Sequence, residues 1–199
     1  MKVYTSDPTD RSTGRVKVGV ADYAVAEAGA TLVTSGLGSC VGIALVDVDA
    51  GVGGLAHAML PEDTSDEAVA DTSDEAVADT SDETVADTND EGIDADGRPS
   101  AAKYVDSAVP ALVEEMVAAG ADPGRIEARL AGGSAMFEFT SRAGAIGERN
   151  AAAARETLEA HAIPLVASDV GGDYGRSLTF DVGGAELSIR RAHGEIHTI

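Results

Sequence analysis

The chain has a single cysteine, Cys40, among its 199 residues, and this scarcity excludes an internal disulfide. A lone thiol is either an inert buried group or a nucleophile held at an accessible position. Cys40 follows a glycine-punctuated segment at 34–39 and precedes an apolar run at 41–46 that predicts a buried strand. A second short apolar strand is predicted at 52–61, and it carries His57. The cysteine therefore has a candidate partner for chemistry on a neighbouring strand.

Long apolar runs are also missing. No stretch approaches the roughly 20 consecutive apolar residues that a membrane helix needs, which argues against membrane insertion. Residues 1–8 lack the apolar stretch of a signal peptide. We therefore expect a cytoplasmic protein, in which a lone thiol stays reduced.

Basic residues are few, and lysine occurs only at positions 2, 17 and 103, whereas the formal net charge is -21. Aromatic residues make up 4% of the chain, and the apolar content depends on alanine and valine. This composition is typical of proteins adapted to high salt, where an acidic and strongly solvated surface maintains solubility. The sequence has no basic patch to neutralise phosphates, so a nucleic-acid partner is not expected.

The acidic residues are concentrated in one segment. Fifteen of them lie between 62 and 96, where no basic residue occurs, within an eight-residue repeat at 63–70, 71–78 and 79–86 that decays from 87 onward. A solenoid or a calcium-binding array is one reading of such a repeat. The units lack the glycine of a calcium loop and have too little apolar surface to offset the entropy of ordering, which favours a solvated disordered loop.

The remaining sequence predicts roughly seven strands and two helices. Helices are predicted at 101–119, with Gly120 as its C-terminal cap, and at 150–162. Further strands are predicted at 16–20, 30–33, 126–130, 165–169, 178–182 and 186–190. These elements predict an α/β fold of the cysteine-hydrolase type, a layered sandwich of mixed or antiparallel sheet with two main helices. We expect a flexible N-terminus at 1–14 and a single domain at 15–199, interrupted by the acidic insertion at 62–97.

Cys40 and His57 meet the first requirements of amide hydrolysis by a thiol. Their strands are separated by a turn at 47–51, so an antiparallel hairpin would bring the outer ends of the two strands together. An adjacent imidazole can activate a thiol, and the small residues Gly38 and Ser39 leave backbone N–H groups accessible as donors to an oxyanion. The alternative readings are a buried structural thiol and a histidine satisfied within the core.

Five segments together resemble the chemoreceptor glutamine deamidases of the CheD family. They are GLGSC at 36–40, HAMLP at 57–61, GGSAMF at 132–137, IGERN at 146–150, and DVGG at 169–172 with Gly175 and Arg176. Their order is the family's, and they span nearly everything from residue 16 to 199 except the acidic repeat.

The resemblance implies an enzyme that converts glutamine side chains on the cytoplasmic helices of chemoreceptors to glutamate and releases ammonia. It assigns Cys40 as the nucleophile, His57 as the base and Thr34 as the polar residue that orients the imidazole. It implies no cofactor and no metal. It also implies a second partner, a CheC-type phosphatase, bound through the face that meets receptors, with Met136 and Phe137 as part of that face.

Two rival functions remain open. The chain could be a non-catalytic binding module that regulates a CheC-type phosphatase, or a different cysteine amidohydrolase that acts on a small free amide. Arg149 and Arg176 are predicted to be ion-paired scaffold residues, and the segment at 132–134 is predicted to be a packing turn. The acidic repeat follows residue 61 directly, so it either tunes access to the site by its charge or maintains solubility.

Overall fold

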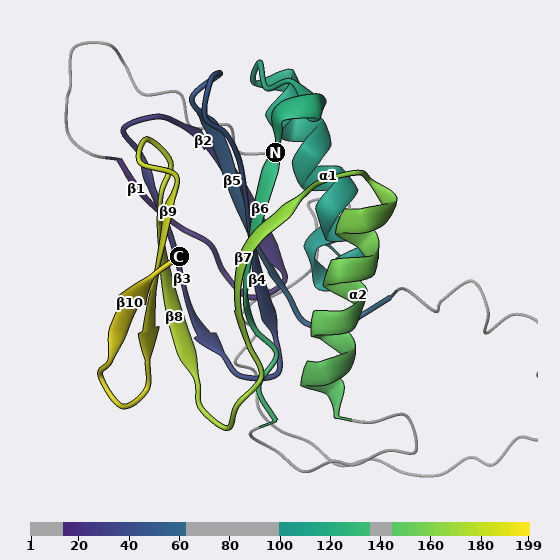
Figure 1. Ribbon diagram of the computed structural model, residues 1–199, viewed down its shortest axis with the longest axis vertical. Coiled ribbons are helices and arrows are strands. Elements are labelled where there is room, and N and C mark those ends of the chain that lie inside the picture. The colour runs from purple at the N-terminus through teal and green to yellow at the C-terminus, as the bar shows by residue number, and fades with distance from the viewer. Residues whose placement is uncertain (1–13, 63–99, 136–144) are drawn as a thin grey trace, which may run out of the picture.

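Three layers make up the fold of the computed structural model, which describes residues 14–62, 100–135 and 145–199. Two five-stranded sheets face each other, and two helices cover the outer face of one of them (Figure 1). The first sheet has the order β2 (Asp22–Glu27), β5 (Val52–Ala58), β4 (Val41–Asp47), β6 (Glu127–Gly132) and β7 (Leu165–Val170). The second sheet has the order β1 (Arg15–Lys17), β3 (Thr31–Leu37), β8 (Arg176–Asp181), β9 (Glu186–Arg191) and β10 (Ile196–Thr198). The helices are α1 (Val105–Ala118) and α2 (Ile146–Ala160).

The central strands of the first sheet are buried on both faces, because helices cover one side and the second sheet covers the other. Every residue of β4 and β5 is buried, which explains their continuous apolar sequences. Strand β8 instead alternates buried and less buried residues along its length, since only one face of the second sheet packs against the core.

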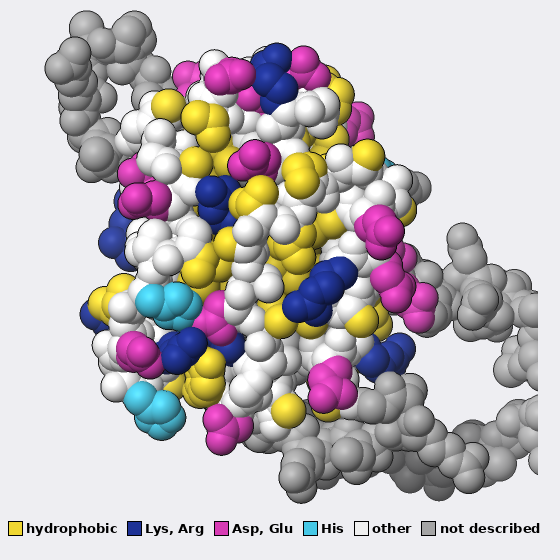
Figure 2. Space-filling model, viewed as in Figure 1, with side chains coloured by type: hydrophobic (Ala, Val, Ile, Leu, Met, Phe, Trp, Pro, Cys, Tyr) yellow, Lys and Arg dark blue, Asp and Glu magenta, His cyan; other side chains and the backbone are white. Residues whose placement is uncertain are grey.

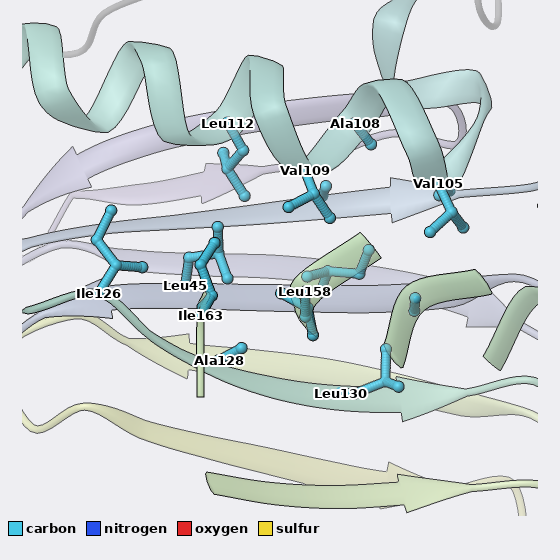
Figure 3. Packing of buried hydrophobic residues seen from close by; sticks show 14 of the residues in the cluster. Leu45, Val105, Ala108, Val109, Leu112, Ile126, Ala128, Leu130, Leu158 and Ile163 are labelled. Carbon is cyan, nitrogen blue, oxygen red and sulfur yellow. The ribbon is translucent and has the colours of Figure 1, made fainter. Parts of the chain in front are cut away.

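Two hydrophobic clusters separate the three layers. In the cluster between the helices and the first sheet, Val105, Val109 and Leu112 of α1 point toward side chains of β4, β6 and α2 (Figure 3). The other cluster lies between the sheets and includes Leu32, Leu55 and Phe180. Cys40 packs against this second cluster.

The predicted α/β layered sandwich with two main helices is confirmed. Strands β4 and β5 form the predicted antiparallel hairpin, with Val41 opposite Ala58 and Asp47 opposite Val52. The described residues contain ten strands rather than roughly seven. Two of the strands were not predicted: the short β10, and β2 at Asp22–Glu27, which forms an edge of the first sheet.

Both helices differ from prediction at their N-terminal ends. Residues Ala101–Lys103 form a 3-10 turn before α1 begins at Val105. Helix α2 begins at Ile146, four positions earlier than predicted, and contains Gly147 in its first turn. A Cβ at Gly147 would lie 2.5 Å from the carbonyl oxygen of Ser134. Close packing therefore requires glycine at this position, although glycine has a low helix propensity.

The chain leaves the described fold after Glu62 and re-enters it at Ser100. The N–H groups of Met59 and Leu60 both donate to the carbonyl oxygen of Lys103 (3.1 Å each), so the two ends are joined. The acidic repeat and nearly all of the predicted flexible N-terminus lie outside the described residues. In the described part of the chain, neither helix is long and apolar enough to cross a membrane.

Candidate active site

Cys40 lies immediately before β4, in a loop that backbone hydrogen bonds hold on one side. The N–H of Gly133 donates to the carbonyl oxygen of Cys40, and the N–H of Ser134 donates to that of Gly38, each at 2.8 Å. A Cβ at Gly132 would overlap the Cys40 carbonyl oxygen, so the backbone of β6 approaches the loop before β4 as closely as only glycine allows. The predicted packing turn at 132–134 therefore supports the cysteine, which is itself partly exposed.

His57 lies on β5, next to the strand that follows Cys40. It is directly opposite Gly42 in the β4–β5 ladder, and Gly42 is two positions after Cys40. A Cβ at Gly42 would meet Leu178 of the second sheet, and Cys40, one residue before β4, packs against the cluster between the sheets, so the thiol and the imidazole lie on the face that looks toward the second sheet. Diagonal neighbours in such a ladder are roughly 7–8 Å apart at the backbone, a span that longer side chains cross.

Thr34 completes the group from the opposite sheet. Its Oγ1 lies 2.8 Å from Nδ1 of His57, and both residues are buried, at 3% and 0% relative exposure. The other imidazole nitrogen, Nε2, is buried and has no hydrogen-bond partner among the described residues. When Nδ1 carries the proton and donates it to Thr34, Nε2 is the basic nitrogen. The structure therefore brings Thr34 and His57 together, with Cys40 on the same side of the first sheet.

Burial sets the protonation state of this group. It lowers the pKa of His57 to about 4, because the imidazolium loses its hydration. Burial also raises the pKa of the Cys40 thiol, an effect that its own backbone N–H partly offsets. At neutral pH the resting site therefore holds a neutral thiol and a neutral imidazole rather than an ion pair.

Asn150 is a residue near the site that the residue-level prediction did not single out. It is fully buried on α2, and its Nδ2 donates to the carbonyl oxygens of Ser39 (2.9 Å) and Met59 (2.7 Å). These two carbonyls lie one residue before Cys40 and two residues after His57. The only sequence signal for it was its place at the end of the segment 146–150.

Arg176 is a second buried residue behind the nucleophile loop. Its guanidinium donates to Asp169 Oδ1 (2.7 Å), to Ser134 Oγ (2.6 Å) and to the Gly171 carbonyl oxygen (2.8 Å). This ion pair confirms the predicted scaffold role of Arg176. Burial of the Asp169 carboxylate acts to raise its pKa, but the hydrogen bonds and charges of the arginines outweigh that effect and lower the pKa. Arg149 lies 3.9 Å from Glu62, which is also an ion pair.

Other predicted features of the site differ in how far they are described. Gly38 and Ser39 lie in the loop directly before Cys40, where their backbone N–H groups have no acceptor among the described residues. Met136 and Phe137 lie outside the described residues.

Within residues 14–62, 100–135 and 145–199, no group of three or more His, Cys, Asp or Glu side chains could hold a metal ion. Acidic side chains are distributed over the face shown in Figure 2 rather than gathered in one patch.

Comparison with known proteins gives relatives along the whole chain. A protein of Haloarcula marismortui named "Probable chemoreceptor glutamine deamidase CheD" is 37% identical over 203 residues, covering all of both chains. The chain belongs to the CheD family. The family model described as "CheD chemotactic sensory transduction" matches residues 88–191.

Two further CheD relatives have similar names. The protein of Natronomonas pharaonis, "Probable chemoreceptor glutamine deamidase CheD", is 38% identical and covers 96% of this chain and 98% of its own. "Probable chemoreceptor glutamine deamidase CheD 2" of Geobacter metallireducens is 42% identical and covers 88% and 92%, respectively. The solved structure of Neisseria meningitidis protein NMB0706 matches with a TM-score of 0.45 and 9% identity, over 80% of this chain and 64% of that one. That likeness is too distant to support an inference.

The segments that carry the CheD resemblance meet around Cys40. The segment 36–40 holds the cysteine, and 57–61 begins with His57. Segment 146–150 is joined to both by Asn150, and Gly171 donates to the Gly132 carbonyl oxygen at 2.9 Å. Residues that are far apart in the chain thus form one continuous support for a thiol.

Proposed function

We propose that this chain is a chemoreceptor glutamine deamidase in which Cys40 is the nucleophile, His57 is the general base and Thr34 orients the imidazole. The observation that carries the assignment is the hydrogen bond between Thr34 Oγ1 and His57 Nδ1, which leaves Nε2 as an unpartnered nitrogen. The ladder register supports the role of Cys40, because it puts the thiol on the same face as that imidazole. The names of the CheD relatives support the reaction and the substrate.

The proposed reaction proceeds through two acyl transfers. His57 Nε2 takes the proton of the Cys40 thiol as Sγ forms a bond to Cδ of the glutamine side chain. The resulting imidazolium gives its proton to the departing nitrogen, the C–N bond breaks, and ammonia leaves behind a thioester. His57 then deprotonates a water molecule that attacks the thioester carbonyl. The C–S bond breaks, the proton returns to sulfur, and the products are glutamate and a free thiol.

The neutral resting pair suits a buried site. Placing a thiolate and an imidazolium in a partly desolvated position costs free energy for each ion. With the pKa of His57 lowered and that of Cys40 raised, the proton moves only as the new C–S bond forms. The backbone N–H groups of Gly38 and Ser39 are the proposed donors to the oxyanion of each tetrahedral intermediate.

The proposal includes two partners and a location. The substrate is the cytoplasmic helical part of a chemoreceptor, which places the enzyme in the cytoplasm. The resemblance also supports a CheC-type phosphatase as a second partner, whose contact would include Met136 and Phe137. The single domain with an acidic insertion at 62–97 is supported by the hydrogen bonds that join Met59 and Leu60 to Lys103.

Incubation with a receptor fragment tests the activity. Purified protein in molar KCl, mixed with a receptor cytoplasmic fragment, should release ammonia and convert specific glutamines to glutamate, as mapped by peptide mass spectrometry. Cys40→Ala should abolish both signals while leaving binding of a CheC-type phosphatase intact. Activity on free glutamine but not on the fragment would identify a small-amide hydrolase instead. An inert wild-type protein that binds the phosphatase would identify a regulatory module.

A further inference from the structure

Asn150 joins the two segments that carry the thiol and the imidazole. Its single Nδ2 group donates to the Ser39 carbonyl oxygen, one residue before Cys40, and to the Met59 carbonyl oxygen, two residues after His57. The side chain comes from α2, on the opposite face of the first sheet from Thr34. Asn150 therefore approaches the site from the helix side, and its hydrogen bonds among the described residues go to these two carbonyls rather than to the thiol or the imidazole.

The bond to Ser39 has a consequence for the next backbone N–H. The Ser39 carbonyl and the Cys40 N–H belong to the same peptide group, which is planar and trans, because the described residues contain no cis peptide. In such a group the C=O and N–H vectors point in opposite directions. Holding the Ser39 carbonyl toward Asn150 and α2 turns the Cys40 N–H away from the helix layer. That direction leads to the side of the sheet where His57 lies.

The Cys40 N–H is the group that this orientation presents to the His57 side of the sheet. Within residues 14–62, 100–135 and 145–199, no backbone carbonyl accepts a hydrogen bond from it. This N–H belongs to the residue whose sulfur would attack the carbonyl, and it acts to lower the pKa of that thiol against the larger effect of burial. A donor beside the attacking sulfur is well placed for the oxygen that becomes negatively charged when sulfur adds to a carbonyl.

The chemical identity of residue 150 is unexpected for packing alone. Its buried neighbours on the same helix are the apolar residues Ala151, Ala154 and Leu158. Burying an amide costs free energy unless its groups are hydrogen-bonded, and Asn150 Oδ1 is buried with no partner among the described residues. An apolar side chain would avoid this cost but would leave the Ser39 and Met59 carbonyls without their donor.

We propose that Asn150 is a positioning residue that orients the Ser39–Cys40 peptide, so that the Cys40 N–H donates to the oxyanion formed during glutamine deamidation. This inference rests on the proposed function. It assigns the main oxyanion donor to Cys40 itself, in addition to the N–H groups of Gly38 and Ser39.

Two reactions of the same thiol separate this role from a merely structural one. Deamidation of a receptor fragment requires the oxyanion donor, whereas alkylation of Cys40 by iodoacetamide is a displacement at carbon that forms no oxyanion. Asn150→Ala should lower kcat for deamidation about 100-fold, the effect of losing one oxyanion donor, with little change in KM. The alkylation rate constant per folded molecule should stay within a few-fold of wild type. His57→Ala is the contrasting variant, because it removes the base and should slow both reactions.

Leu158→Ala is the matched control for packing, since Leu158 is buried on the same helix, two turns after Asn150, and its apolar side chain cannot donate to a carbonyl of the loop. It should lower the melting temperature but leave both rate constants per folded molecule unchanged. If Asn150→Ala does not fold, Asn150→Ser is measured in the same way. Serine changes the side-chain volume less than alanine does and retains one donor. Unchanged kcat, or an equal loss in both reactions, would overturn the positioning role. A wild-type protein that alkylates but releases no ammonia would instead overturn the proposed function.

Discussion

Thr34 and His57 form a hydrogen bond of 2.8 Å between two different sheets, with Thr34 on β3 of the second and His57 on β5 of the first. The residue that holds the imidazole, Thr34, therefore belongs to the other sheet. The geometry of the base depends on how the two sheets pack together. A change that shifts one sheet against the other is expected to reach the site through this bond.

Removing the Thr34 hydroxyl should impair catalysis more than stability. Thr34→Val keeps the shape of the side chain but leaves His57 Nδ1 without its partner, so the imidazole can adopt the tautomer in which Nε2 is not basic. We expect kcat for ammonia release to fall about 10- to 100-fold, less than the roughly 100- to 10,000-fold that a positioned acid–base group itself contributes, because the imidazole stays in place. Thr34→Ser retains the hydroxyl and should keep most of the activity. Equal activity of Thr34→Val and wild type would show that the hydroxyl does not orient the base.

The pH dependence of kcat/KM should follow the lowered pKa of His57. With a pKa of about 4, the imidazole is the free base above that value and can accept the thiol proton. We expect kcat/KM on a receptor fragment to be level from about pH 5 to pH 8 and to fall only as pH approaches 4. Circular dichroism at each pH would identify any loss due to unfolding. A half-maximal rate near pH 6.5 would instead show a base with the ordinary histidine pKa.

The same shift predicts how stability depends on pH. In the unfolded chain His57 has a pKa near 6.5, and in the folded protein the value is about 4, so the unfolded state binds more protons between these values. The free energy of unfolding should therefore fall as pH decreases from 6.5 to 4, by about 3 kcal/mol in total. His57→Gln, which does not titrate, should lack this part of the loss. Denaturant titrations of both proteins at pH 7 and pH 4.5 measure it, and parallel losses would contradict it.

The sequence predicts the part of the site that depends on local pattern. Two apolar runs separated by a short turn indicate a hairpin, and this hairpin aligns Cys40 and His57 on one face. Local pattern does not show whether Thr34 or the adjacent Ser35 faces the imidazole, although neighbouring residues of a strand point to opposite faces. The pairing of β3 with β8 decides it: Thr34 is opposite the buried Leu178, and a register shift follows at Ser35. That pairing joins segments more than a hundred residues apart, which local pattern does not encode.

Asn150 shows the same limit from the side of the helices. A polar residue in an alanine-rich helix reads as a solvent-exposed position, and nothing nearby in the sequence provides its partners. Those partners are the carbonyl oxygens of Ser39 and Met59, which belong to loops about a hundred residues earlier. The short β10 was missed because three residues carry too little pattern, and it is defined by its pairing with β9.

Gly132→Ala should disturb Cys40 through the backbone. Gly132 has φ +115°, and an added Cβ would overlap the Cys40 carbonyl oxygen, which is backbone and cannot rotate away. Gly120 provides a matched control, since it has φ +105° but nothing within 4 Å of an added Cβ. Both alanine variants carry the strain of a positive φ, which costs on the order of 1–3 kcal/mol. Only Gly132→Ala adds the displacement of the nucleophile loop.

We therefore expect Gly120→Ala to lower the melting temperature while its activity per folded molecule and its Cys40 alkylation rate stay at wild-type values. Gly132→Ala should be destabilised further and should lose deamidation activity even at temperatures where circular dichroism shows it folded. Equal activity of the two folded variants would mean that the contact between β6 and the Cys40 carbonyl plays no part in positioning the nucleophile.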